Sequence, residues 1–300
     1  MEKINLSNDV AISRIVHGMW RLDSWGFDAQ QTLSFIDSCL DFGISTFDHA
    51  DIYGNYTVEE MFGKALALNP ALREKMQIVT KCGIKLISAN RPDHKLKYYD
   101  TSKEHIVWSV ENSLKNLHTD YIDVLLLHRP DPLMDPAEVA EAFSQLKKEG
   151  KVRAFGVSNF KPTAYRLLNS YLDTPLVTNQ IEISATHLEH FTEGTIETCQ
   201  QDRISPMAWS PLGGGSIFTS EEESVRRVRI VLEQVKEEQG ATSIDQILYA
   251  WLLTHPAKII PIVGSGKIDR VQAAVESLNY TLTREQWFKI YEAYRGKEVD

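Results

Sequence analysis

Short, continuous apolar runs recur along the chain, and most are followed by a stretch whose apolar positions have helical spacing. Continuous rather than alternating apolar runs are typical of parallel strands that are covered on both faces. We therefore predict strands within eight segments, residues 14–20, 44–48, 77–81, 121–128, 152–158, 176–180, 204–210 and 258–264.

The intervening stretches carry helix start and stop signals. In "DPAEVAEAFSQLKKEG", Asp135 can cap the helix, Pro136 suits its first turn, Glu138 completes a capping box and Gly150 ends it. Asp28 and Gln31 make a similar pair before a helix that stops at Gly43. Further helices are predicted over residues 58–67, from about residue 102, and over residues 162–171.

Eight strand–helix units fit a closed (β/α)8 barrel, an α/β fold of roughly 250 residues. An open, doubly wound parallel sheet is the alternative. No linker, repeat or shift in composition divides the chain, so residues 1–300 are expected to form one domain. Residues 3–14 are expected to form a short hairpin before the barrel. A helix over residues 221–239 and a tail from residue 282 are additions to it.

Composition narrows the classes of function. The chain is 43% hydrophobic and 24% charged, which is ordinary for a globular protein. Its net charge of -9 excludes the domain-wide positive field of a nucleic-acid-binding protein. The three cysteines form no CxxC pair, the N-terminus is polar, and the apolar runs are too short to cross a bilayer. These features predict a cytoplasmic protein with no membrane partner.

Ionisable residues collect at the carboxyl ends of the predicted strands. Asp48 ends one strand, with Tyr53 in the loop beyond, while Lys81 and His128 end the next two. In a parallel barrel these ends meet on one face, where active sites are built. Each residue alone has an ordinary explanation, such as a turn cap for Asp48 or a core position for His128.

Together the four residues predict a general acid with groups that tune it. A tyrosine is a weak acid, with a reference pKa of about 10. A neighbouring ammonium group makes its proton easier to give, Asp48 would hold Lys81 in place, and His128 would orient a carbonyl or relay the proton. Reduction of a carbonyl needs such an acid and a separate hydride source.

Nicotinamide cofactors supply hydride, yet the usual GxGxxG fingerprint is absent, so a dinucleotide would have to bind to barrel loops. Asn159 and Gln180 suit a carboxamide, Trp209 suits ring stacking, and "SPLGGGS" offers amides to a pyrophosphate. Arg270 with its neighbours suits a 2′-phosphate, which favours NADP(H). The predicted cofactor residues are Ser158, Asn159, Gln180, Trp209, Ser210, Pro211, Leu212, Gly213, Gly214, Gly264, Ser265, Lys267 and Arg270.

Substrate-binding residues are harder to assign. Trp20, Arg21 and Trp25 follow the first barrel strand and are predicted to line the pocket. The loop over residues 83–101 is long for a βα connection and is predicted to form a lid. Small aldehydes, diketones and sugar-derived carbonyls all remain candidate substrates for a monomer or a weak homo-oligomer.

The sequence resembles the aldo-keto reductases over essentially its whole length. The motifs that carry the resemblance are "GISTFDHADIYG", "IVTKCG", "LLLHRPDP", "FGVSNF", "TNQIEIS", "WSPLGGG" and "IVGSGKIDR". It is most similar to a bacterial branch of uncharacterised reductases. The resemblance implies a metal-free (β/α)8 oxidoreductase of the EC 1.1.1 type that reduces aldehydes and ketones with NADPH. It also implies that Asp48, Tyr53, Lys81 and His128 form the catalytic tetrad.

Two departures from the family pattern stand out. Trp209 occupies the ring-stacking position where tyrosine or phenylalanine is more familiar, and stacking survives that change. After Arg270 the chain reads "VQAA", where many members carry Glu-Asn against the adenine. Adenine contacts are therefore expected to be weaker or to come from elsewhere.

Two rival functions remain open at this point. One is a metal-dependent barrel hydrolase that uses Asp48, His49, Asp51, His128 and Asp131, although an HxH pair is missing. The other is a nucleotide-binding sensor or regulatory subunit with little turnover, because a fold alone does not settle function.

Overall fold

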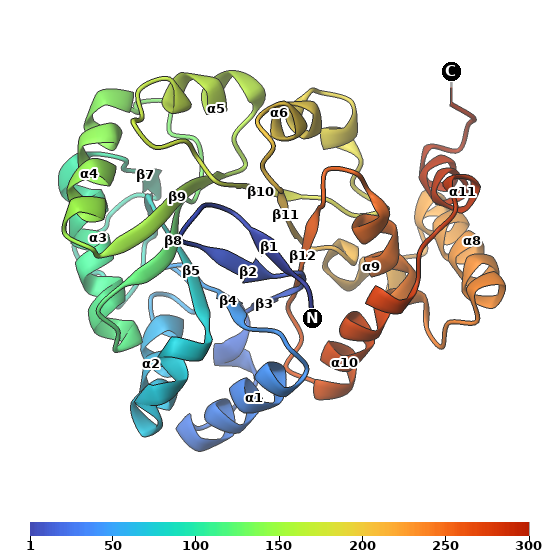
Figure 1. Cartoon of the computed structure of the whole chain (residues 1–300), viewed down its shortest axis with the longest axis horizontal. Coiled ribbons are helices and arrows are strands. Elements are labelled where there is room, and N and C mark those ends of the chain that lie inside the picture. The colour runs from blue at the N-terminus through green and yellow to red at the C-terminus, as the bar shows by residue number, and fades with distance from the viewer. Residues whose placement is uncertain (300) are drawn as a thin grey trace.

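Eight parallel strands close into a barrel in the computed structural model, which describes residues 1–299 (Figure 1). Neighbouring strands follow one another in sequence order, and the last pairs with the first. The (β/α)8 prediction is therefore confirmed and the open-sheet alternative is wrong. The strands are β3 (Val16–Gly18), β4 (Thr46–Asp48), β5 (Gln77–Cys82), β8 (Ile122–Leu127), β9 (Val152–Ser158), β10 (Asn179–Glu182), β11 (Met207–Trp209) and β12 (Ile260–Val263).

Each strand overlaps its predicted segment, but most are shorter. The strand predicted over residues 176–180 lies further along the chain, at Asn179–Glu182. Its apolar start, Leu176 and Val177, is buried ahead of the regular pairing. Hydrophobicity thus marked the buried segment correctly, but the strand continues past it to Glu182.

Helices surround the barrel on its outside (Figure 1). Asp28 and Gln31 form the predicted capping box before the first helix. Asp135 caps its helix through the amide of Ala137, not through the amide of Glu138 as a capping box requires. The surrounding helices are α1 (Ala29–Asp41), α2 (Val58–Leu68), α3 (Lys103–Leu117), α4 (Pro136–Lys148), α5 (Pro162–Asn169), α6 (Thr195–Gln201), α9 (Ile244–Thr254) and α10 (Ile268–Glu276).

The predicted additions are present. Strands β1 (Lys3–Asn5) and β2 (Ala11–Ser13) form an antiparallel hairpin that lies across one opening of the barrel (Figure 1). Helices α8 (Glu223–Gln239) and α11 (Arg284–Arg295) lie side by side on one flank. The remaining short elements are β6 (Ile84–Lys85), β7 (Tyr98–Tyr99), α7 (Ser216–Thr219) and the 3-10 turns Leu22–Ser24, Pro70–Lys75, Glu189–Phe191, Gly213–Gly215 and Ser277–Asn279.

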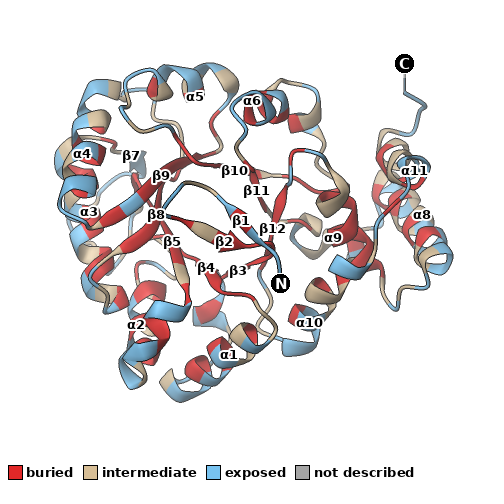
Figure 2. Cartoon of the chain, viewed as in Figure 1, coloured by how far each residue is buried: buried red, intermediate tan, exposed pale blue. Residues whose placement is uncertain are grey.

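The barrel strands are buried on both faces (Figure 2). Inside, Val16, Val79, Val124 and Met207 pack with apolar residues of the β1–β2 hairpin, which closes that end. Outside, the strands pack against the apolar faces of the helices. Two covered faces explain the continuous apolar runs, and they leave the opposite end of the barrel as the place for polar residues. No helix in residues 1–299 has both the length and the apolar character needed to span a membrane.

Helices α2 and α3 approach closely at Gly63. A Cβ atom on Gly63 would lie 1.9 Å from the carbonyl oxygen of Asn116 and 2.8 Å from the ring of His118. Backbone atoms cannot move aside as a flexible side chain can. Only glycine therefore fits at this crossing of the helices that flank the site described below.

We expect Gly63→Ala to lower the free energy of unfolding by roughly 1–3 kcal/mol, because overpacking a close contact forces backbone shifts. Urea denaturation followed by circular dichroism measures this change. The control is Lys64→Ala at the exposed neighbouring position, expected to change stability by less than about 0.5 kcal/mol. Equal stability of the two variants would contradict the close contact.

Candidate active site

A buried ion pair lies at the carboxyl ends of β4 and β5. The ammonium nitrogen of Lys81 is 2.9 and 2.8 Å from the two carboxylate oxygens of Asp48. It also donates to the carbonyl oxygen of His49 at 2.7 Å and to the hydroxyl of Tyr53 at 3.1 Å. Lys81 is only 1% exposed. The structure therefore brings together the carboxylate, ammonium and phenol that the sequence predicted to meet.

Asp48 is held from a third strand as well. The side-chain amide of Gln180, on β10, donates from Nε2 to Asp48 Oδ1 at 2.7 Å. The Gln180 main-chain carbonyl in turn accepts from the hydroxyl of Ser158 at 2.8 Å. A continuous hydrogen-bonded chain thus runs from Tyr53 through the ion pair toward the opposite wall of the barrel.

The electrostatic balance favours a charged lysine and a neutral tyrosine. Burial alone would lower the pKa of Lys81, but the Asp48 carboxylate and the hydrogen bonds outweigh it and raise that pKa above its ordinary value. Burial raises the pKa of Tyr53, and the nearby Asp48 adds to this, while Lys81 opposes it. Lys81 thus acts on Tyr53 in the direction expected from the sequence, but burial outweighs it. Tyr53 keeps its proton in the neutral range.

His128 completes the group of four. Its ring meets the ring of Tyr53 edge to face, with centroids 5.9 Å apart. Burial, with Lys81 and Arg129 nearby, holds the pKa of His128 well below its ordinary range. The Nδ1 atom is buried and has no hydrogen-bond partner in the part of the chain that the structure describes. His128 is therefore a neutral imidazole, which can donate one hydrogen bond and accept another.

The facing wall carries two residues with strained backbone. Asn159 has φ of +61° and Ser210 has φ of +50°, both in the left-handed region that non-glycine residues rarely adopt. The amide of Asn159 donates to Ser158 Oγ and accepts from the Trp209 indole nitrogen at 3.0 Å. Such strain at strand ends is common in ligand sites, because surrounding contacts hold the residues in place.

The glycine loop and the last βα loop also have features suited to a ligand. Gly213, Gly214 and Gly215 all have positive φ, from +59° to +99°, so this loop is tightly turned. Lys267 and Arg270 are exposed at the start of α10. Amides at a helix start and two cations make an environment that favours anionic groups.

The three predicted substrate residues do not form one group. Trp20 is 59% exposed, and the Arg21 guanidinium lies 5.3 Å from the centre of its ring. Trp25 packs on Gly266, where an added Cβ would be 2.6 Å from the indole. Trp25 therefore supports the loop that carries Lys267.

The alternative metal ligands do not gather either. His49 is buried edge-on against Phe62, and burial, Lys81 and His17 lower its pKa to about 3. Asp51 accepts instead from Ser109 on α3. Across residues 1–299, no group of three or more His, Cys, Asp or Glu side chains is arranged to hold a metal ion.

Sequence reasoning missed two features of this site. It assigned Gln180 to a cofactor and did not foresee its hydrogen bond to Asp48. It also did not single out Arg129, whose guanidinium lies 5.8 Å from the centre of the Trp209 ring. The position of Arg129 directly after His128 was the available signal.

The comparisons with known proteins agree with this architecture. The chain matches the aldo/keto reductase family over residues 14–295. It is 58% identical over 299 residues to the uncharacterized oxidoreductase YcsN of Bacillus subtilis, with 100% of both chains covered. It is 44% identical over 300 residues to a 6-dehydroglucose reductase of Agrobacterium fabrum, again with 100% of both covered.

A solved structure shows the same fold. It is an aldo/keto reductase from Klebsiella pneumoniae in complex with NADP and acetate, 24% identical, with a TM-score of 0.78. The match covers 95% of this chain and 92% of that one. The family match spans nearly the whole barrel, including every strand end that carries the site. The chain belongs to the aldo/keto reductase family.

Proposed function

We propose that this oxidoreductase uses NADPH to reduce an aldehyde or a ketone to an alcohol. The observation that carries the proposal is the phenol of Tyr53, placed 3.1 Å from a buried lysine ammonium group, where burial raises the pKa of the phenol. A proton donor fixed beside a permanent positive charge suits a reaction that generates an alkoxide.

Each residue of the site has a distinct role in this proposal. Tyr53 donates its proton to the carbonyl oxygen of the substrate. Lys81 stabilises the phenolate that remains, and Asp48 keeps Lys81 charged and oriented. Neutral His128 hydrogen-bonds the carbonyl oxygen and so fixes its position relative to Tyr53.

The residues on the facing wall fit a dinucleotide. NADPH supplies a hydride to the carbonyl carbon when it is bound. Asn159 and Trp209 would hold the nicotinamide end, and the tightly turned loop of Gly213 to Gly215 offers backbone amides to a pyrophosphate. The exposed cations at the start of α10 would hold a 2′-phosphate. The NADP bound to the Klebsiella pneumoniae relative supports this choice of cofactor.

The name of one relative supports a sugar-derived carbonyl as the substrate. The Agrobacterium fabrum protein is a 6-dehydroglucose reductase, and it aligns along the full chain. Turnover should therefore be tested with a panel of carbonyl compounds that contains simple aldehydes and diketones as well as sugar aldehydes. The assembled tetrad favours an enzyme over a sensor, because a sensor would need only the cofactor residues.

Tyr53→Phe is expected to remove most turnover, because it deletes only the acidic hydroxyl; general acids contribute about 10²–10⁴-fold. Binding of NADPH, followed by its fluorescence, should change less than about twofold, since the ring remains. The control is Tyr171→Phe at an exposed position outside the site. Turnover is measured as NADPH consumption over the carbonyl panel. Full activity of Tyr53→Phe would refute the mechanism, and tight NADPH binding by the wild type without any turnover would favour the sensor.

Arg270→Ala is expected to weaken NADPH binding by about ten- to a hundredfold and to leave NADH binding nearly unchanged, because a charged hydrogen bond is worth about 1.5–3 kcal/mol. Titration calorimetry with both cofactors measures this difference. Arg226→Ala removes an exposed arginine on α8 and serves as the control. Equal losses for the two cofactors would place the 2′-phosphate elsewhere.

A further inference from the structure

The turn directly after Tyr53 is strained. Gly54, Asn55 and Tyr56 have φ of +56°, +54° and +71°, so three consecutive residues lie in the left-handed region. Glycine tolerates that region, asparagine less so, and a bulky tyrosine rarely adopts it. The amides of Thr57 and Val58 both donate to the carbonyl oxygen of Tyr53. The turn and the backbone of Tyr53 therefore form one unit.

Strained backbone persists only where surrounding contacts hold it. Here they come from the loop over residues 83–101. The amide of Leu86 donates to the hydroxyl of Tyr56 at 2.8 Å. The side-chain amide of Asn90 donates to the carbonyl oxygen of Asn55 at 2.9 Å. The loop thus forms hydrogen bonds with both non-glycine residues of the turn, Asn55 and Tyr56.

Arg91 of the same loop adds a third contact. Its guanidinium carbon lies 4.6 Å from the centre of the Tyr56 ring and 5.5 Å from the centre of the Trp108 ring on α3. Cations over aromatic faces are attracted by the ring quadrupole. Arg91 therefore ties the turn to α3 as well as to the loop.

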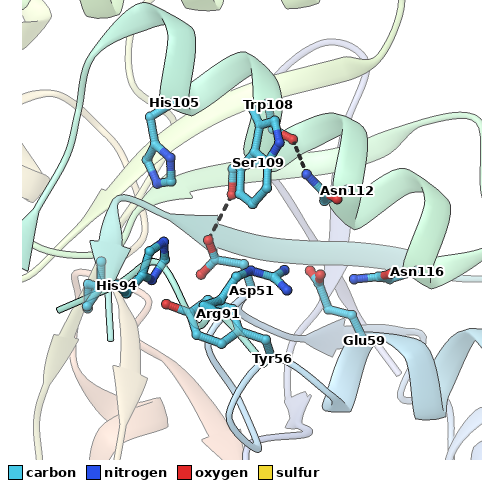
Figure 3. A pocket seen from close by; sticks show the side chains of 11 residues that line it. Asp51, Tyr56, Glu59, Arg91, His94, His105, Trp108, Ser109, Asn112 and Asn116 are labelled. Carbon is cyan, nitrogen blue, oxygen red and sulfur yellow. Dashed lines mark hydrogen bonds between the residues drawn. The ribbon is translucent and has the colours of Figure 1, made fainter. Parts of the chain in front are cut away.

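Arg91 also covers a small polar cavity (Figure 3). Asp51 and Glu59 point into the cavity from one side, and polar side chains of α3 line the other. The cavity has a volume of about 10 Å³, which is room for one water molecule and no larger ligand. The cavity therefore lies at the packing interface between α2, α3 and the loop over residues 83–101 and is too small to be a ligand site.

We propose that the loop over residues 83–101 is a clamp that fixes the turn behind Tyr53, with Arg91 as its positioning residue, and that ionisation of Asp51 loosens the clamp. The proposal rests on the role of Tyr53 as proton donor given above. It assigns the loop a task in addition to the lid predicted from the sequence.

Asp51 is placed to sense pH. Ser109 Oγ donates to one carboxyl oxygen at 2.8 Å, while the other oxygen is buried with no hydrogen-bond partner among residues 1–299. The Arg91 Nε atom is likewise buried and has no partner within this described part of the chain. Burial, with Glu59 nearby, raises the pKa of Asp51 to about 8, although Ser109, the Ile52 amide and Arg91 oppose the shift.

Other titratable groups face Asp51 from every neighbouring element. Glu59 lies on α2, His94 on the loop and His105 on α3. On β5, the main-chain carbonyl of Lys81 accepts a hydrogen bond from the amide of Asp51, and the Cys82 thiol has its pKa raised well above the ordinary value. Burial lowers the pKa of His105 to about 4, so that ring is neutral across the range of interest.

The sign of the pH effect follows from linkage. The closed clamp favours protonated Asp51, whereas opening would admit water and return its pKa toward the reference value of about 3.9. Opening therefore releases a proton, and rising pH favours opening until Asp51 is ionised in the closed state too. Protection of the clamp's amides from hydrogen exchange should therefore fall as the pH rises between the two pKa values, and it should level off above about pH 8.

Arg91→Met tests the clamp, with Lys97→Met in the same loop as the matched control. Hydrogen exchange of the amides of Thr57 and Val58 should accelerate roughly tenfold in Arg91→Met, and kcat should fall by a similar factor, the equivalent of one lost interaction. The Kd for NADPH should stay within about twofold. Arg91→Lys, which keeps the charge but not the planar group, should restore part of kcat.

The outcomes separate this proposal from the proposed function. Exchange and kcat equal to those of Lys97→Met would overturn the clamp. If Arg91→Met fails to fold, Tyr56→Phe removes only the hydroxyl that accepts from Leu86 and is judged by the same measurements. Faster exchange in a protein that never reduces a carbonyl would support the clamp and refute the reductase.

The pH dependence is tested by the Leu86 amide, which the Tyr56 hydroxyl protects. Exchange is measured from pH 6 to pH 9 and corrected for its intrinsic rate. Protection in the wild type should fall by up to about tenfold per pH unit below pH 8, whereas Asp51→Asn should show no such slope. Equal slopes in both proteins would overturn the role of Asp51.

Discussion

An ammonium group sealed inside a barrel is the constraint on which the whole site depends. Burial disfavours the charged form of Lys81, and this cost is offset because Asp48 and the His49 carbonyl surround its nitrogen. Breaking a buried pair by removing one partner typically costs about 3–5 kcal/mol, since a lone charge remains. The carboxyl ends of β4, β5 and β10 must therefore stay in register, because Gln180 of β10 completes the shell around Asp48. The barrel holds these strand ends together, and a shift between them would leave the charge of Lys81 or Asp48 buried without its partner.

The same burial decides the chemistry. Tyr53 sits beside a positive charge, which alone would favour its phenolate, yet loss of water outweighs that attraction and the phenol keeps its proton. His128 is kept neutral by burial and by nearby cations. A neutral acid, a permanent cation and a neutral hydrogen-bonding imidazole thus coexist within one site.

Much of this arrangement could be predicted from sequence, because a parallel barrel converts strand order into proximity. Asp48, Lys81 and His128 end buried apolar runs, and such ends share one face. Packing decided what the pattern could not. Trp25 packs on Gly266, a contact that the sequence pattern could not show because only the folded chain brings that glycine near. The dominant effect of burial on the pKa of Tyr53 could not be predicted for a similar reason, since burial depends on atoms that are distant in the sequence.

Tyr53, the proposed proton donor, differs from Asp48 and Lys81 in how its backbone is held. Asp48 and Lys81 lie within strands, so the ladder of the barrel fixes their backbone. Tyr53 lies beyond the end of β4, in a segment whose next residues are strained and are gripped by Leu86, Asn90 and Arg91. Loops on this scaffold vary freely to fit different substrates. In this chain the loop over residues 83–101 contacts the turn that follows Tyr53. Under the proposed mechanism, changes in this loop would therefore alter proton delivery as well as substrate binding.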